Sequence, residues 1–206
     1  MAITGEAYGG SMLMPAWTNQ SLSSNLEEGS GGTYAFNMGN PQAQGYLGWS
    51  AEASDAIGTF TYGTTNTNYL VRVPVATGGV TTKADISVTA TTGTVTSVLA
   101  GLYTAGGVQV AAAPDIHSGW AAGKQTFTWT TPINIQSGTY YYVSLIMAQS
   151  VAPQLTAATA SAVQNFNTTV ATSVFATNGT AAALPATYTM SSNVASALAI
   201  PWVAIY

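Results

Sequence analysis

The residues that could perform catalysis are few in this chain. Its single histidine, His117, follows Asp115 by two residues in a loop bounded by Pro114 and Gly123. Nucleophilic catalysis with such a pair needs a serine within reach of the histidine and an acid that orients the ring, and the chain contains no Gly-x-Ser-x-Gly turn that would present a serine. We therefore interpret His117 as a solvent-facing loop residue, and a hydrolase that depends on it as the least favoured function.

Carboxylate and metal chemistry have equally little support. Glycoside hydrolysis needs two carboxyl groups that face each other across a cleft. Glu52 and Asp55 are close in sequence, but nothing marks them as a catalytic pair. One histidine and no cysteine exclude a zinc triad and thiolate-held metals, and no acidic calcium loop is present. The sequence predicts a protein that is not an enzyme and has no cofactor or metal site; a calcium ion held by backbone carbonyls stays open as an alternative.

Tryptophan side chains offer another kind of chemistry, because a flat ring can stack on the apolar face of a sugar. Trp129 and Trp202 lie in alternating segments that predict core positions, and Trp49 is expected where the N-terminal segment joins the domain. Trp120 lies in the loop after His117. We favour a position that caps the end of the fold, and the alternative is that it faces solvent. Trp120 and His117 are therefore the candidate glycan-facing residues.

The elements that position these residues belong to a chain with very little charge. Of its 206 residues only 5% are charged, with three basic and seven acidic side chains, against roughly 25% in an average protein. Three basic residues cannot neutralise a phosphate backbone, so we expect no nucleic-acid partner. No apolar run has the roughly 18 residues of a membrane span, and the first residues lack the pattern of a secretory signal. A surface of hydroxyls and amides suits a protein that touches neighbours in an assembly.

Hydrophobic periodicity predicts strands and no long helix. Residues 69–75 alternate between apolar and other side chains, and Pro74 indicates an edge strand or a bulge. Residues 126–130 alternate as well, and we expect Pro132 to end that strand. Residues 140–147 are apolar on both faces, which predicts a central strand. Turn signals recur about every eight to twelve residues, as they do in β-sandwiches and barrels.

We predict two regions, an N-terminal arm over residues 1–47 and an antiparallel, jelly-roll-like β-sandwich over residues 48–206. The fold class is all-β. The arm is expected to be extended or irregular, and its apolar cluster would need a partner surface to cover it. The alternatives are that the arm wraps its own domain or forms irregular edge strands. The members of the apolar cluster, which are the candidate partner-binding residues, are Met12, Leu13, Met14 and Trp17.

The C-terminal third is less clearly patterned. Residues 156–185 are rich in alanine, threonine, serine and asparagine, so we expect weakly specified strands and long loops, with a turn at Asn178-Gly179. The chain then ends in a predicted strand over residues 198–206. The residues expected to share one face of that strand are Ile200, Trp202, Ala204 and Tyr206.

A series of short motifs runs from Gly48-Trp49 to Leu155. In chain order they are Tyr69-Leu70-Val71-Arg72-Val73-Pro74, Ala100-Gly101-Leu102-Tyr103-Thr104-Ala105-Gly106-Gly107, Asp115 with Trp120 and Gly123, Pro132, and Gly138-Thr139-Tyr140-Tyr141-Tyr142. Their order and spacing resemble a β-sandwich module of tailed bacteriophages of actinobacteria, found in tail-associated and head-surface proteins. The resemblance covers about half of the chain and does not extend to the arm or the alanine- and threonine-rich tail.

The resemblance implies a virion structural protein, made in the host bacterial cytoplasm, without catalytic residues to carry over. In this interpretation Gly101 and Gly106 permit tight backbone, and Tyr103 with Tyr141 or Tyr142 fills the core. Because collagen-like and heptad segments are absent, a capsid decoration or accessory protein is favoured over a fibre. The expected partners are the major capsid protein or other virion proteins and further copies of the chain, a trimer being favoured. The alternative is a minor tail or receptor-binding module that recognises a host cell-surface glycan.

Overall fold

The structure is a computed structural model that describes residues 41–52, 55–91, 93–158, 169, 172–196 and 199–206. The predicted partner-binding residues Met12, Leu13, Met14 and Trp17 lie outside the described residues, as does most of the predicted arm. Short 3-10 turns are found at η1 (Pro41–Gln44), η2 (His117–Gly119) and η5 (Met190–Ser192). None of the helices in the described part of the chain has the length and apolar character that a membrane crossing requires.

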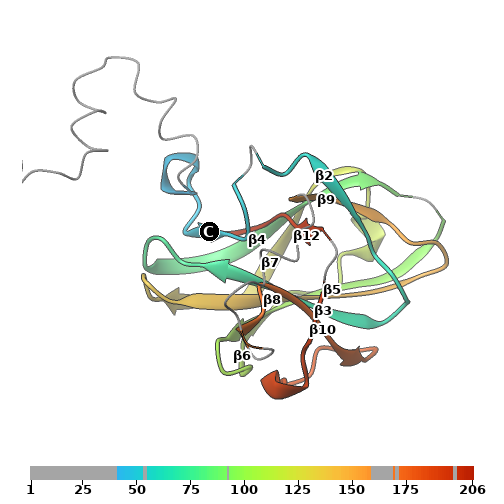
Figure 1. Cartoon of the computed structure of the whole chain (residues 1–206). Coiled ribbons are helices and arrows are strands. Elements are labelled where there is room, and N and C mark those ends of the chain that lie inside the picture. Colours follow the sequence, from blue (N-terminus) through green and yellow to red (C-terminus); the bar gives the residue numbers. More distant parts are fainter. Residues whose placement is uncertain (1–40, 53–54, 92, 159–168, 170–171, 197–198) are drawn as a thin grey trace, which may run out of the picture.

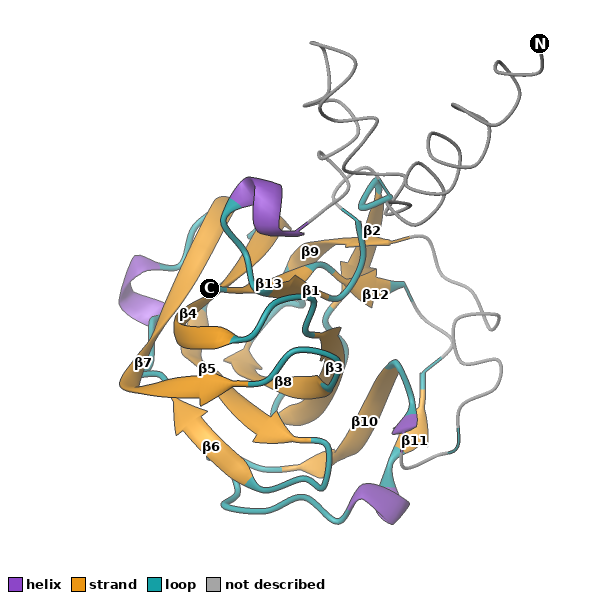
Figure 2. Ribbon diagram, turned by 90° about the vertical axis from the view of Figure 1, so that its left-hand side faces the viewer, coloured by secondary structure: helices purple, strands orange, loops and turns teal. Residues whose placement is uncertain are grey.

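Two antiparallel sheets pack against each other (Figures 1 and 2). Sheet A contains β1 (Gly48–Trp49), β2 (Gly58–Thr61), β4 (Gly79–Ala90), β7 (Gly123–Ile135), β9 (Gln154–Ala158), β12 (Ile200–Pro201) and β13 (Val203–Ile205). Sheet B contains β3 (Thr67–Pro74), β5 (Val95–Thr104), β6 (Gln109–Ala112), β8 (Tyr140–Gln149), β10 (Phe175–Thr180) and β11 (Val194–Ala195). The predicted all-β, antiparallel sandwich is confirmed.

The strand pairing is that of a jelly roll. β2 pairs with β9, β3 with β8, β4 with β7, and β5 with β6, so that each pair nests inside the one before it along the chain. From β2 to β9, consecutive strands alternate between the sheets except at the innermost β5–β6 hairpin. This folding of one long nested hairpin places β2-β9-β4-β7 in sheet A and β3-β8-β5-β6 in sheet B, the order of double-sheet jelly rolls.

The main core lies between the two sheets. It takes alternate residues from each strand, among them Val71 of β3, Ile86 of β4, Phe127 and Trp129 of β7, and Leu145 of β8, all buried. Because successive side chains of a strand point to opposite faces, the period-2 pattern places one set inside and the other outside. β8 lies between β3 and β5, which confirms the central strand predicted for residues 140–147.

Pro74 and Pro132 do not have the effects on their strands that the sequence predicted. β3 is an interior strand between β10 and β8, and Pro74 is its last residue, beyond the part that pairs with β10. The missing N–H of Pro74 therefore breaks no ladder between β3 and β10. Pro132 does not end β7, which continues to Ile135. Residues 129–132 instead lie opposite Thr82 alone, and this irregularity accommodates the proline.

Two further predictions in the C-terminal third are corrected. Asn178-Gly179 is a register shift within β10, with Gly179 at a φ of +66°, and not a turn that joins two strands. The last strand divides at Trp202 into β12 and β13. Ile200 packs into the main core, whereas Trp202 and Ala204 belong to a cluster on the outer face of sheet A. The predicted single face for these residues is therefore wrong.

Candidate functional site

The loop that holds His117 is organised by Asp115. The Asp115 Oδ1 atom accepts hydrogen bonds from the backbone N–H of Val98 at 2.8 Å and of His117 at 2.9 Å, and it lies 3.1 Å from Nδ1 of His117. Partial burial opposes ionisation, but these hydrogen bonds and one from the Ser97 hydroxyl lower the pKa of Asp115. The aspartate, not the histidine, thus receives the serine hydrogen bond, and its contacts hold η2 in place.

Trp120 lies at the end of the sandwich, three residues after His117. It is half-buried and packs against the main core, and its backbone N–H donates to the His117 carbonyl at 3.1 Å. The indole Nε1 is buried and has no partner among the described residues. Trp120 therefore caps the core in the way that we favoured, and only part of its ring is accessible to a sugar.

A cavity lies away from the His117 loop, beside the ends of β3 and β9. We call it the β3–β9 cleft; its volume is about 610 Å³, within the roughly 300–1,000 Å³ range of small-molecule sites. A second cavity of about 370 Å³ shares Ser50, Ala51, Glu52 and Pro74 with it and extends toward Trp49. The residues that line the cleft are Ser50, Ala51, Glu52, Asp55, Ile57, Arg72, Pro74, Ala158 and Val174.

The segment after β1 is seated tightly, and this seat shapes the cleft. A Cβ at Gly48 would lie 2.2 Å from the Pro74 carbonyl oxygen, so only glycine lets β1 approach the end of β3 this closely. The Ser50 hydroxyl donates to the Pro201 carbonyl at 2.8 Å and accepts from the Val203 N–H at 2.9 Å. Ser50 thereby bridges the break between β12 and β13 and directs the following residues over sheet A.

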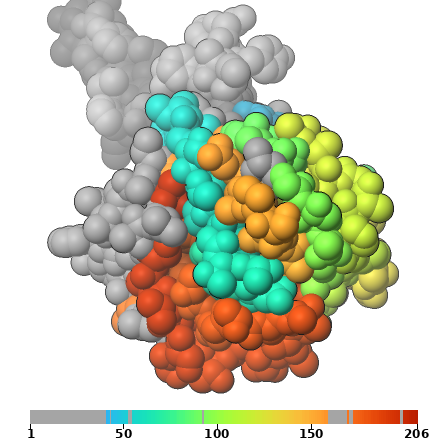
Figure 3. Space-filling model, turned by 90° about the vertical axis from the view of Figure 1, so that its right-hand side faces the viewer, coloured from blue at the N-terminus to red at the C-terminus, as the bar shows by residue number. Residues whose placement is uncertain are grey.

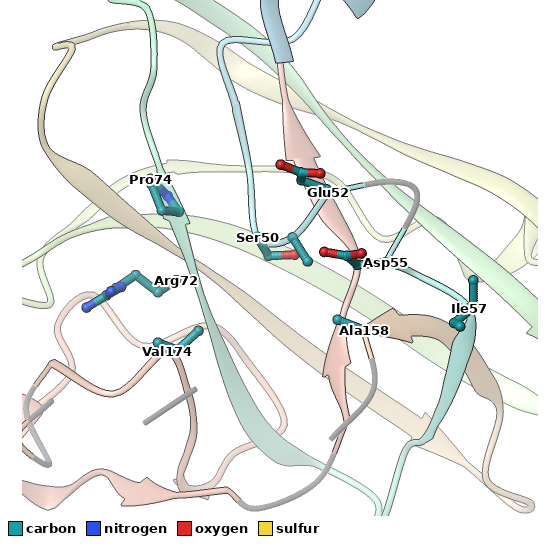
Figure 4. A pocket seen from close by; sticks show the side chains of 9 residues that line it. Ser50, Glu52, Asp55, Ile57, Arg72, Pro74, Ala158 and Val174 are labelled. Atoms are coloured by element: carbon teal, nitrogen blue, oxygen red, sulfur yellow. The ribbon is translucent and has the colours of Figure 1, made fainter. Parts of the chain in front are cut away.

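Opposite charges lie on opposite walls of the cleft (Figure 4). Glu52 and Asp55 are exposed and belong to one turn, in which the Asp55 N–H donates to the Glu52 carbonyl at 3.0 Å. Arg72 lies on the other wall; its Nη1 donates to the Thr172 carbonyl at 2.9 Å, and its guanidinium carbon is 5.0 Å from the centre of the Tyr140 ring. Figure 4 shows the guanidinium directed away from the two carboxylates.

Only part of this site could be recognised from the sequence. The sequence shows Glu52 and Asp55 as neighbours without a role, and Arg72 as one position of an alternating strand. A lone arginine between Val71 and Val73 was the signal that could have found it, because arginine is rarely placed in an apolar strand without a partner. The structure does not bring His117 or Trp120 to this cleft.

Within the described residues, no three histidine, aspartate or glutamate side chains are grouped so that they could hold a metal ion. The fold and the cleft define the class of the protein, which is a two-sheet jelly roll with charged side chains on a surface cavity. Comparisons with models of protein families and with curated proteins find no match for the chain.

Proposed function

We propose that the protein is a structural component of a bacteriophage virion, a decoration or accessory protein of the capsid that docks through its N-terminal arm. The supporting observation is the arrangement of the motifs that resemble the phage module. The segments 69–74, 100–107 and 138–142 are far apart in sequence but belong to β3, the β5–β6 hairpin and β8. These strands are direct neighbours in sheet B. These three segments therefore form one continuous part of sheet B, whereas Gly48-Trp49, Gly123 and Pro132 belong to β1 and β7 of sheet A.

The nearly uncharged surface is consistent with an assembly that depends on shape complementarity between neighbouring proteins. The chain carries ten charged residues, and several of the described ones contact each other or the backbone, as Lys124 contacts Asp85 and Asp115 contacts Val98. Copies of such a protein repel each other weakly, which favours dense packing on a particle. The expected form is a homo-oligomer, a trimer being favoured.

The arm supplies the attachment in this proposal. Tyr46 at the end of the arm, and Gly48 and Ser50 directly after it, hold the chain on sheet A, so a force on the arm is transmitted to the folded domain. Burial of each large apolar side chain of the cluster against the shell would contribute about 1.5–3 kcal/mol. Several copies in one oligomer would add their effects through avidity.

The experiment replaces Met12, Leu13, Met14 and Trp17 by serine in the full chain and measures the copy number on purified particles. The matched control replaces Glu27 and Glu28 by glutamine, which alters the same arm but leaves the apolar cluster intact. We expect a folded protein, by circular dichroism, that is lost from particles only in the serine variant. Normal copy number of that variant would overturn arm docking.

The alternative function is a minor tail or receptor-binding role in which the module recognises a host cell-surface glycan. The observation that favours it is the β3–β9 cleft with its two exposed carboxylates, and not the half-buried Trp120. Particles that lack the protein would then assemble normally but adsorb poorly to host cells.

A further inference from the structure

We propose that the β3–β9 cleft is a binding site for a neutral saccharide, with Asp55 as its principal hydrogen-bond acceptor and Ile57 as its apolar wall. The inference concerns the purified protein and does not require the virion role. It assigns a ligand class to residues to which the sequence motifs gave no function.

The distribution of charge is the first reason. Three of the ten charged residues of the chain, Glu52, Asp55 and Arg72, line this one cavity. In a chain that covers its surface with neutral side chains, such a concentration is unusual. A cavity of this size with a small number of polar and charged groups on its walls is typical of a ligand site.

The balance of donors and acceptors is the second reason. The Ser50 hydroxyl is occupied by the backbone of Pro201 and Val203, and the Nη1 atom of Arg72 by the Thr172 carbonyl. The carboxylate of Asp55 is acceptor-only and exposed. A ligand that contacts Asp55 must therefore bring donors, and the hydroxyl groups of a sugar are donors that bind carboxylates through charge-assisted hydrogen bonds. On the other wall the Nε of Arg72, a buried donor, has no partner among the described residues.

The apolar lining is the third reason. The Ile57 side chain is 81% exposed although it is a large aliphatic group, and it lies at the cleft with Pro74, Ala158 and Val174. A sugar ring has an apolar C–H face and a polar rim, so it matches a site with aliphatic walls and carboxylates at the edge. Aliphatic side chains that line a cavity together with a few polar groups are typical of a ligand site.

Competing ligands fit less well. An anion would meet two carboxylates, while the one guanidinium is directed away from them (Figure 4). A calcium ion takes six to eight oxygen ligands, whereas Glu52 and Asp55 are the only carboxylates on the cleft among the described residues. An isolated ammonium group would use the carboxylates but leave the aliphatic side chains of Ile57 and Val174, which lie on opposite sides of the cleft, without a contact.

The test measures binding of the full-length chain to neutral oligosaccharides of glucose, galactose, mannose, arabinose and N-acetylglucosamine, each at millimolar concentration, by saturation-transfer NMR and calorimetry. We expect at least one to bind, Asp55→Asn to weaken its affinity about tenfold or more because a charged acceptor is lost, and Ile57→Ser to weaken it by a smaller factor. Both residues are exposed, so both variants should keep the thermal midpoint of the parent.

Two controls match these variants. Asp115→Asn removes a carboxylate outside the cleft, and Val194→Ser removes an exposed apolar side chain on β11; both should leave the affinity unchanged. The proposal is overturned if no saccharide binds, if Asp55→Asn binds as tightly as the parent, or if titration of calcium alone perturbs the Asp55 and Glu52 resonances. None of these outcomes affects particle incorporation, which tests the virion role separately.

Discussion

The outer faces of sheets A and B are both covered by other parts of the chain, but different interactions hold the two coverings in place. Each carries side chains that do not belong to the main core, and each is covered by a segment from outside the nested strands. Sheet A is covered by Tyr46, Ala56 and the chain end at Tyr206, and sheet B by residues 181–190 after β10 together with Ser173 before it. The first segment is held around one buried charge, the second by neutral hydroxyl groups.

On sheet A the central group is Asp85, whose side chain is completely buried. Its carboxylate accepts hydrogen bonds from the hydroxyls of Thr126 at 2.6 Å and of Tyr46 and Tyr206 at 3.2 Å, and it lies 3.4 Å from Nζ of Lys124. These four groups come from three distant parts of the chain, because Thr126 and Lys124 both belong to β7. One carboxylate thus joins the segment before β1, the strand β7 and the chain end.

On sheet B the contacts are dispersed. The Tyr103 hydroxyl donates to the Pro185 carbonyl at 2.7 Å and the Tyr142 hydroxyl to the Ser173 carbonyl at 3.0 Å. The hydroxyls of Tyr188 and Ser144 lie 2.7 Å apart in a buried pair. Tyr103 and Tyr142 are thus fully buried, as expected of core residues, and their cluster lies on the outer face of sheet B.

The two coverings differ in how strongly their contacts depend on one another. A single charged acceptor makes several contacts depend on one side chain, because its loss leaves three half-buried hydroxyls without this acceptor. Separate neutral contacts fail one at a time. The two cavities described above also lie next to residues 49–52 and 55–57, which belong to the side of the charged cluster. We infer that the covering of sheet A leaves room for a ligand, whereas the tyrosines of sheet B fill the space over it.

Strong alkali should remove both coverings at once, and this is the largest expected effect. Burial, and then the negative charge of Asp85, raises the pKa of Tyr46 to about 12, and burial raises the pKa of Tyr103, Tyr142 and Tyr188 as well. Unfolded tyrosines ionise near pH 10, so above that pH the unfolded state binds fewer protons than the native state.

The contribution of these tyrosines to the free energy of unfolding is therefore fully present below about pH 10, and it is lost as the pH rises through about 12. The measurement is tyrosinate absorbance together with near-ultraviolet circular dichroism during an alkaline titration. We expect tyrosinate formation and loss of tertiary signal to coincide. Full ionisation near pH 10 in a molecule that keeps its tertiary signal would contradict the buried hydroxyl contacts on both faces.

Asp85→Ala should be the most damaging of the point changes on the covering of sheet A. It removes the acceptor of three buried or half-buried hydroxyls, and we expect it to lower the free energy of unfolding by about 3–4 kcal/mol. Urea denaturation measures the change. Ser144→Ala, which removes one neutral partner from sheet B, should lower it by about 1–2 kcal/mol; equal effects would remove the contrast between the faces.

Gly107→Ala should damage the covering of sheet B. Gly107 has a φ of +85°, and an added Cβ would lie 2.3 Å from the Tyr188 carbonyl oxygen. We expect a loss of about 2–4 kcal/mol from backbone strain and displacement of Tyr188. Gly106→Ala is the matched control, because its Cβ would meet nothing nearer than 3.8 Å, and a comparable loss there would contradict this assignment.

Lys124→Gln should have the smallest effect. The lysine side chain is 61% exposed although its partner Asp85 is buried, so solvent screens much of the interaction. We expect a loss below about 1 kcal/mol that shrinks as salt is added. A loss that approaches that of Asp85→Ala, or one that is insensitive to salt in parallel melts, would mean that the ion pair and not the three hydroxyls holds the covering.

The strands were predictable where the pattern was local. Residues 140–147 and Trp129 were assigned correctly from alternation alone, and Ala105-Gly106-Gly107 was recognised as a turn. The conformationally special glycine is nevertheless Gly107 and not Gly106, because the residue that needs the positive φ is chosen by the approach of Tyr188. The candidate site was predictable only to the extent that Glu52 and Asp55 are neighbours in sequence.

The amino-acid sequence by itself determined the all-β class, the central strand, the nearly uncharged surface and the lack of thiol or zinc chemistry, since composition and alternation are local properties of the chain. Only the tertiary structure decided the nested strand order, the burial of Asp85 among donors up to 121 residues away, and the meeting of Arg72 with Glu52 and Asp55 at one cleft. Contacts between distant residues depend on which strands pair, and no local pattern specifies that.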